Sequence, residues 1–92
     1  MELNFSANKI GDEGAKLIAE ASYLRNLTKL FLDENELTEV SGKHLSESEF
    51  LTKLTHLSLS FNKLKEEGAQ MLASGKNFEK LTHIWLENND IK

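Results

Sequence analysis

The sequence from Leu54 to Leu64 reads LTHLSLSFNKL. Apolar residues stand at its first, fourth, sixth and last positions, and the ninth position is an asparagine. The same pattern, Leu-x-x-Leu-x-Leu-x-x-Asn-x-Leu, begins again at Leu27, and it returns from Leu81 to Ile91 with isoleucine in two places. Residues 3–10 carry its later part. A pattern that recurs in this way along a short chain predicts a stack of similar structural units.

The length of the unit is set by the asparagines, which stand 27 residues apart. Leucines at alternating positions place one face of a short strand in the core. The asparagine then falls in a turn inside the stack, where an unpaired backbone donor or acceptor costs about 1–3 kcal/mol. Because an asparagine side chain both accepts and donates hydrogen bonds, we expect a ladder that joins each turn to the next. Its members are Asn8, Asn35, Asn62 and Asn89.

The second half of each unit has the spacing of a helix. Small residues follow the first three asparagines by six and seven positions, and apolar residues follow them by ten and sixteen. This spacing predicts an inward helical face whose small residues let the helix approach the sheet closely. Acids four positions after the asparagines, Asp12, Glu39 and Glu66, suit the positive end of the helix dipole. The second unit departs most, with Ser41-Gly42 and His44, so its helix is expected to be shorter or less regular.

The unit from Leu54 to Leu64, followed by Gly68-Ala69 and Leu72-Ala73, resembles a leucine-rich repeat of the ribonuclease-inhibitor type. Similar repeats occur in NOD-like receptors, Ran GTPase-activating proteins and bacterial effectors, and the resemblance covers essentially the whole chain. It implies an α/β solenoid with parallel strands on the concave side and helices on the convex side. We expect a single array with units at 1–26, 27–53 and 54–80 and a partial unit at 81–92.

Composition excludes several classes of partner. The 92 residues carry a formal net charge of −4, with acids and bases interspersed. Binding to nucleic acid or to an anionic membrane needs a clustered basic face, so neither is expected. The chain contains no cysteine, which excludes disulfides and thiolate zinc sites and is typical of intracellular proteins. We expect a cytoplasmic protein, or a bacterial effector acting inside a host cell, that uses no cofactor.

Neither end of the array carries the polar capping unit that usually covers the core of a terminal repeat. The last unit also ends soon after its asparagine and has no room for a helix. We therefore expect either a piece of a longer array or a protein that covers its ends by self-association.

The outward positions of the predicted strands form the candidate binding surface. Phe31 and Trp85 lie between inward residues, and exposed large aromatics commonly anchor interfaces. The alternatives are that single exposed aromatics have no role, and that Trp85 covers the end of the array. Phe61 is expected to pack inside its turn. The candidate contact residues are Phe31, Asp33, His56, Ser58, His83, Trp85 and Glu87.

His56 and His83 fall in one column on neighbouring strands, so their Cβ atoms should lie about 5 Å apart. Two histidines at that distance could share a transition metal, but Lys29 continues the column and would repel a cation. Two solvated histidines on a binding face, sensitive to pH, are the preferred interpretation, and no metal site is expected.

Catalytic motifs do not stand out from the repeat. Ser60-Phe61-Asn62-Lys63 has a Ser-x-x-Lys spacing, but the repeat explains each of its positions, and no enzyme is expected. The sequence predicts a module that binds another protein through the concave sheet face. Two alternatives stay open: a sensor or regulatory segment of a larger receptor or effector, and a GTPase-activating protein. The single arginine, Arg25, gives the last alternative no distinctive support.

Overall fold

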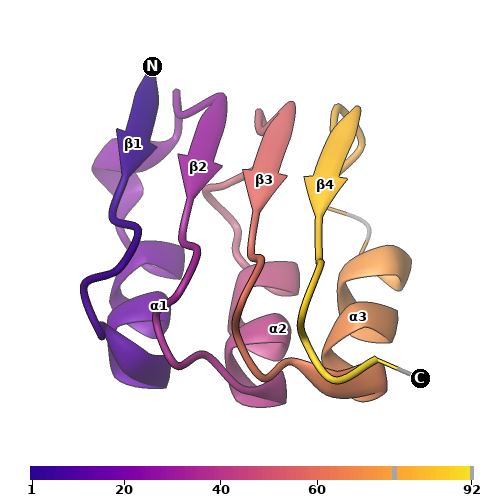
Figure 1. Ribbon diagram of the computed structural model, residues 1–92. Helices are drawn as coiled ribbons and strands as arrows, with labels where there is room; N and C mark the ends of the chain where they lie inside the picture. Colours follow the sequence, from indigo (N-terminus) through magenta and orange to yellow (C-terminus); the bar gives the residue numbers. More distant parts are fainter. Residues whose placement is uncertain (76, 92) are drawn as a thin grey trace.

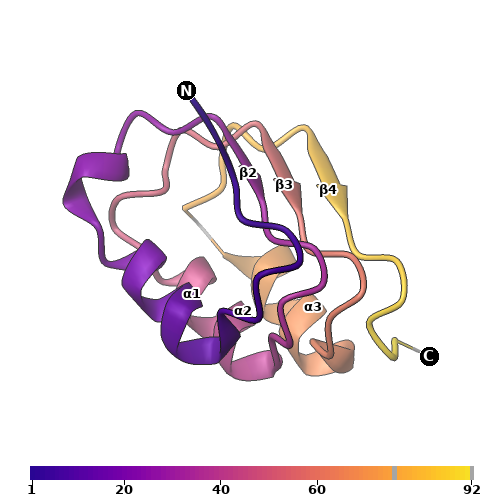
Figure 2. The same cartoon turned by 60° about the vertical axis from the view of Figure 1, so that its left-hand side comes forward.

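The computed structural model describes residues 1–75 and 77–91, which form a layer of strands backed by a layer of helices (Figure 1; Figure 2). The strands are β1 (Glu2–Asn4), β2 (Lys29–Phe31), β3 (His56–Ser58) and β4 (His83–Trp85). The helices are α1 (Gly11–Ala19), the 3-10 helix η1 (Ser22–Leu24), α2 (Glu39–Ser46) and α3 (Lys65–Ser74). The predicted alternation of strand and helix is confirmed. Within this part of the chain, no helix combines the length and the apolar character needed to cross a lipid bilayer.

The strands pair in parallel in the order β1-β2-β3-β4, so neighbours in sequence are neighbours in the sheet. Leu30 pairs with Leu57, and Leu57 pairs with Ile84, so the register advances by 27 residues from strand to strand. Equivalent positions of successive units therefore lie side by side, and every column of the repeat becomes a row of side chains across the sheet.

The core lies between the sheet and the helices and is made mainly of leucine. Leu30, Leu57 and Leu59 are fully buried, as are most leucines of the two central units. The corresponding side chains of the outer units, such as Leu3 and Ile84, are partly exposed because each has a neighbouring unit on one side only.

The asparagine ladder connects each turn to the one before it. Asn62 is buried, and its Oδ1 accepts hydrogen bonds from the backbone N–H of Asn35 at 2.8 Å and of Leu37 at 3.1 Å. Its Nδ2 donates to the carbonyl oxygens of Leu59 at 2.9 Å and Leu32 at 3.1 Å. One amide side chain thus satisfies backbone groups in two units at once.

The other asparagines repeat this arrangement as far as their surroundings allow. Asn35 accepts from the N–H of Asn8 at 2.9 Å, and Asn89 accepts from the N–H of Leu64 at 3.2 Å. Asn8 is exposed, and its Nδ2 donates within its own turn. The ladder predicted from the sequence is confirmed, and no buried side-chain nitrogen or oxygen among the described residues lacks a hydrogen-bond partner.

Glycines in the helices allow neighbouring helices to touch through their backbones. A Cβ placed on Gly42 in α2 would lie 3.0 Å from the Cα of Gly68 in α3. We expected the small residues to bring each helix close to the sheet. For Gly42 and Gly68 this expectation was wrong, because these glycines bring α2 close to α3 instead. A side chain at position 42 would have to displace backbone atoms of α3.

The start of α2 is fixed by the preceding unit as well as by its own residues. Thr38 caps α2 by accepting a hydrogen bond from the N–H of Val40, while neither α1 nor α3 has a side-chain cap. Asp12, at the start of α1, accepts hydrogen bonds from the N–H and hydroxyl of Thr38 and from the hydroxyl of Ser41. α2 has eight residues against nine and ten in α1 and α3, which confirms the shorter helix expected for this unit.

The pKa of Asp12 is set by two opposing effects. Partial burial raises the pKa, but the hydrogen bonds from Ser41 and Thr38 outweigh it and leave the pKa below its ordinary value. In the first unit, the acid four positions after the asparagine is Asp12. It therefore holds the start of α2 in addition to facing the dipole of α1.

We expect the substitution Asn62→Ala to lower the free energy of unfolding by at least about 3 kcal/mol, since several buried backbone groups lose their partners at about 1–3 kcal/mol each. Asn8→Ala is the matched control, because the Nδ2 of the exposed Asn8 serves only its own turn. We expect its cost to stay below about 1 kcal/mol. Urea titrations of both variants measure the difference, and equal losses would contradict the ladder as the main connection between units.

We expect Asp12→Asn to destabilise the protein near neutral pH and much less in acid. The lowered pKa of Asp12 means that its stabilising effect is present above about pH 4 and is lost as the pH falls through the folded-state value. Urea unfolding at a series of pH values measures this. Glu13→Gln, which removes an exposed carboxylate from the same helix, serves as the control and should change the free energy of unfolding by less than about 0.5 kcal/mol at neutral pH.

Candidate binding face

The sheet turns one face toward the helices and leaves the other open. Each strand and the turn after it place three side chains on this open sheet face, and the strand register aligns them in three rows. The histidine row is Glu2, Lys29, His56 and His83; the aromatic row is Asn4, Phe31, Ser58 and Trp85; the carboxylate row is Ser6, Asp33, Ser60 and Glu87.

The two histidines of the histidine row stack on each other. Their ring centroids lie 4.5 Å apart and their planes differ by 4°. The Trp85 ring completes the cluster, with centroids 6.0 Å from His56 and 5.7 Å from His83. The Nδ1 atom of each histidine pairs with the hydroxyl of the preceding threonine, at 2.8 Å for Thr55 and 2.9 Å for Thr82. Trp85 is half-buried and packs against both histidine rings.

The stacked geometry is unsuited to a shared metal. The lone pair of an imidazole nitrogen lies in the plane of its ring, and one ion cannot lie in two parallel planes that are separated by a stacking distance. Among the residues described, no group of three or more histidine, aspartate or glutamate side chains is placed to hold a metal ion.

The same packing lowers the pKa of His56. The first cause is partial burial, followed by repulsion from His83 and from Lys29, while Glu2 acts in the opposite direction. The folded protein thus binds a proton at His56 less readily than the unfolded chain. Acidification below about pH 6.5 therefore costs folded-state stability, and His56 stays neutral at higher pH.

The aromatic row forms the walls of a trough. Phe31 pairs with Ser58 in the register, and Ser58 pairs with Trp85, so the two large aromatics flank a serine. The resulting depression has a volume of about 360 Å³. Its lining residues are Phe31, Asp33, Ser58, Ser60, Phe61, Trp85 and Glu87.

Ser58 differs from its expected role as an exposed contact residue. It is only 5% exposed, because its small side chain lies between the larger Phe31 and Trp85. Its hydroxyl donates to Oδ1 of Asp33 at 2.6 Å. Ser58 forms the floor of the trough, while Phe31 and Trp85 are half-buried walls.

Two carboxylates converge on the floor of the trough through Ser60. The N–H of Ser60 donates to Oδ1 of Asp33 at 2.9 Å, and its hydroxyl donates to Oε1 of Glu87 at 3.1 Å. Asp33 and Glu87 belong to the second and fourth units, so the serine between them holds both acids in place. Five residues of the candidate contact set, Phe31, Asp33, Ser58, Trp85 and Glu87, thus meet in one depression.

Phe61 was expected inside its turn, and that expectation was wrong. Its side chain is 56% exposed at the rim of the trough. Its backbone has a φ of 59°, as at Ala7, Glu34 and Asn88, the corresponding positions of the other units. A bulky residue rarely adopts this left-handed conformation, which costs about 1–3 kcal/mol. A phenylalanine at a position where the turn favours asparagine or glycine is a signal that the sequence could have provided.

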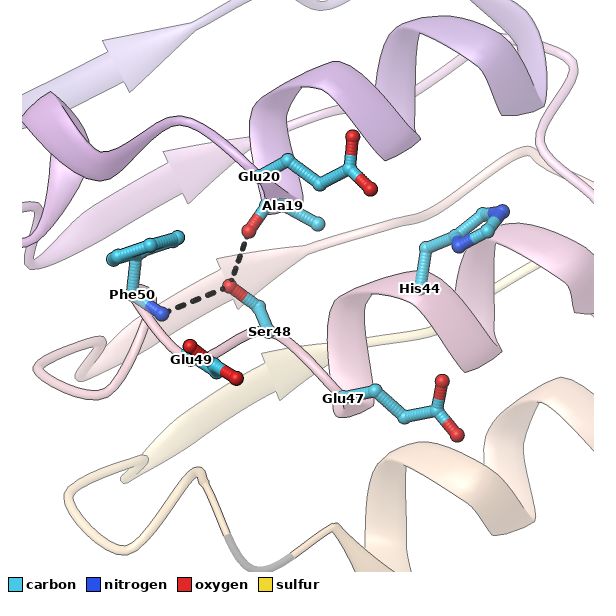
Figure 3. A pocket seen from close by; sticks show the side chains of 7 residues that line it. All are labelled: Ala19, Glu20, His44, Glu47, Ser48, Glu49 and Phe50. Carbon is cyan, nitrogen blue, oxygen red and sulfur yellow. Dashed lines mark hydrogen bonds between the residues drawn. The ribbon is translucent and has the colours of Figure 1, made fainter.

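A second depression, of about 310 Å³, lies between α1 and the residues that follow α2 (Figure 3). Its side chains include Glu20, His44 and Glu47, which extend toward the same side in this view without meeting, and Glu49, which lies apart from them. The hydroxyl of Ser48 closes its floor by donating to the carbonyl oxygen of Ala19 at 2.6 Å. These acids do not converge, and the depression serves as the seam between two units.

Comparison with protein families agrees with this geometry. A family model described as Leucine Rich repeat matches residues 1–19 and 50–73. The fold is that of a leucine-rich-repeat solenoid. The unmatched stretch between the two matches contains α2, where the leucine-rich repeat departs most from the other units. A search of curated proteins found no match to the chain.

We expect Phe61→Asn to stabilise the leucine-rich-repeat fold by about 0.5–1 kcal/mol, since asparagine tolerates the left-handed conformation and little burial is lost. Phe61→Leu is the control, because it removes the aromatic ring but keeps the strained backbone. Thermal and urea unfolding measure both variants. A loss of stability in Phe61→Asn as large as in Phe61→Leu would show that the ring packs as part of the core.

Proposed function

We propose that the open sheet face binds another protein, with the trough between Phe31 and Trp85 as the centre of the contact. Leucine-rich repeats generally mediate protein–protein interaction and are typically not enzymes. The observation that supports this face is the pair of large aromatics beside a serine floor, on a side of the sheet that no described element covers. Aromatic side chains in a desolvated central pocket supply much of the binding energy of interfaces.

The composition of the face favours a protein over a nucleic acid. Asp33 and Glu87 stand at the floor of the trough, and their charges would repel phosphates. The stacked histidines and Trp85 give rigid, flat aromatic area, which binds with a low cost in side-chain entropy.

We also propose that the units belong to the ribonuclease-inhibitor-like subclass and that the protein acts inside cells. The subclass is supported by the helix of eight to ten residues in each of the three complete units. The intracellular location is supported by the absence of cysteine from the chain. Self-association would act through the first unit at the edge of the sheet, where the apolar side chains of Met1 and Phe5 are exposed beside β1.

We expect the double substitution Phe31→Ala/Trp85→Ala to weaken binding by more than about tenfold, because truncation of an aromatic anchor commonly costs about 2 kcal/mol or more. Peptides selected from a random library on the unmodified chain provide the probe, and fluorescence anisotropy measures their affinity. Circular dichroism with heating checks that the variant stays folded.

The matched control is Leu17→Ala/Tyr23→Ala, since these side chains are even more exposed but lie on α1 and η1. It should leave the affinity unchanged. Selected peptides that bind the Phe31→Ala/Trp85→Ala variant as well as the unmodified chain would overturn the proposed face. A loss of affinity in the Leu17→Ala/Tyr23→Ala variant alone would move the binding surface to the first helix.

A further inference from the structure

We propose that the trough between Phe31 and Trp85 accepts an arginine side chain of a protein partner. This inference rests on the interaction function proposed above and adds the chemistry of the residue that enters the face. Three features of the trough carry it: its two aromatic walls, the hydrogen bonding of its two carboxylates, and the absence of hydroxyl donors from its serine floor.

The walls of the trough are aromatic. Phe31 and Trp85 lie two strands apart, on either side of Ser58, and adjacent strands are separated by about 4.8 Å. The two rings border the same depression. An aromatic ring attracts a cation that lies within about 6 Å of its centroid, and it can stack on a planar guanidinium.

Each carboxylate of the trough uses one oxygen in hydrogen bonds with other described residues and leaves the other oxygen without a donor from among them. Asp33 accepts from Ser58 and Ser60 through Oδ1, and Glu87 accepts from Ser60 through Oε1. Within residues 1–75 and 77–91, no donor is placed on Oδ2 of Asp33 or on Oε2 of Glu87. Both acids are thus oriented through one oxygen, and the other oxygen can still accept hydrogen bonds.

The floor offers acceptors and no hydroxyl donors. The hydroxyl hydrogens of Ser58 and Ser60 both point to carboxylate oxygens, so each hydroxyl presents only its lone pairs to the trough. A carbonyl or carboxylate ligand would find no donor on this floor. A guanidinium has five N–H donors and no acceptor, so it complements the floor, the acids and the rings together.

Arginine fits this set better than lysine does. Its guanidinium stacks on aromatic faces and forks toward carboxylates, while the ammonium of lysine is compact and strongly hydrated. Lys29 stands in the histidine row, on the far side of the aromatic row from the acids. The positive group of the ligand is therefore directed toward the carboxylate row.

Nuclear magnetic resonance titration of the whole chain with three blocked tripeptides tests the proposal. Their central residue is arginine, lysine or citrulline, and citrulline keeps the shape of arginine without its charge. We expect the arginine tripeptide to shift the indole N–H signal of Trp85 and the amide signals of Ser58 and Ser60. We expect it to bind about tenfold more tightly than the citrulline tripeptide, because bonds between ionised groups are about twice as strong as neutral ones. Equal affinity for both, or shifts confined to other parts of the chain, would overturn the proposal.

Two double variants test whether the carboxylates of Asp33 and Glu87 cause the preference for arginine. Asp33→Asn/Glu87→Gln should abolish the preference for arginine over citrulline, and Asn at position 33 keeps an oxygen to accept from Ser58 and Ser60. Glu13→Gln/Glu79→Gln removes the same charge from exposed positions elsewhere and should keep the preference. Loss of the preference in this control alone would overturn the assignment. If library-selected peptides need Phe31 and Trp85 but carry no arginine, this inference fails while the proposed function stands.

Discussion

Backbone groups inside a stack of turns have no access to water, and the fold depends on how they are satisfied. Asn62 does this for its own unit and for the one before it, through two bonds accepted at Oδ1 and others donated from Nδ2. An amide that spans two units also fixes their register. Because the register is fixed, residues 27 apart lie side by side. This alignment produces the rows of side chains on the open sheet face.

The sequence predicted the fold in detail wherever a contact repeats from unit to unit. The strand leucines and the ladder asparagines recur at constant spacing. Residues at equivalent positions of the repeat therefore have the same structural role. Contacts made once were not predictable. The bonds from Thr38 and Ser41 to Asp12, and the approach of Gly42 to Gly68, depend on how one particular helix lies against the next. Spacing along the chain carries no information about that placement.

For the candidate site, the sequence predicted which residues share a row on the sheet, but not how their side chains pack. His56 and His83, and Phe31 and Trp85, could be assigned to shared rows of the sheet because strand register follows from the repeat. The stacking of the histidines and the burial of Ser58 depend on side-chain rotamers and on the size of flanking residues. Phe61 was misplaced because hydrophobicity suggested the core, whereas the left-handed turn holds its ring outside.

The missing side chain at Gly42 has a geometrical effect on the opposite face. Hydrogen bonds keep neighbouring strands about 4.8 Å apart, whereas packed helices ordinarily lie about 8–10 Å apart. This difference bends a strand–helix stack into an arc with its sheet on the inner side. Contact between the backbones of Gly42 and Gly68 lets α2 and α3 approach closely, which acts against the bend at this step of the stack. A larger residue at position 42 would push these helices apart and so bend the open sheet face further inward, without touching any ligand.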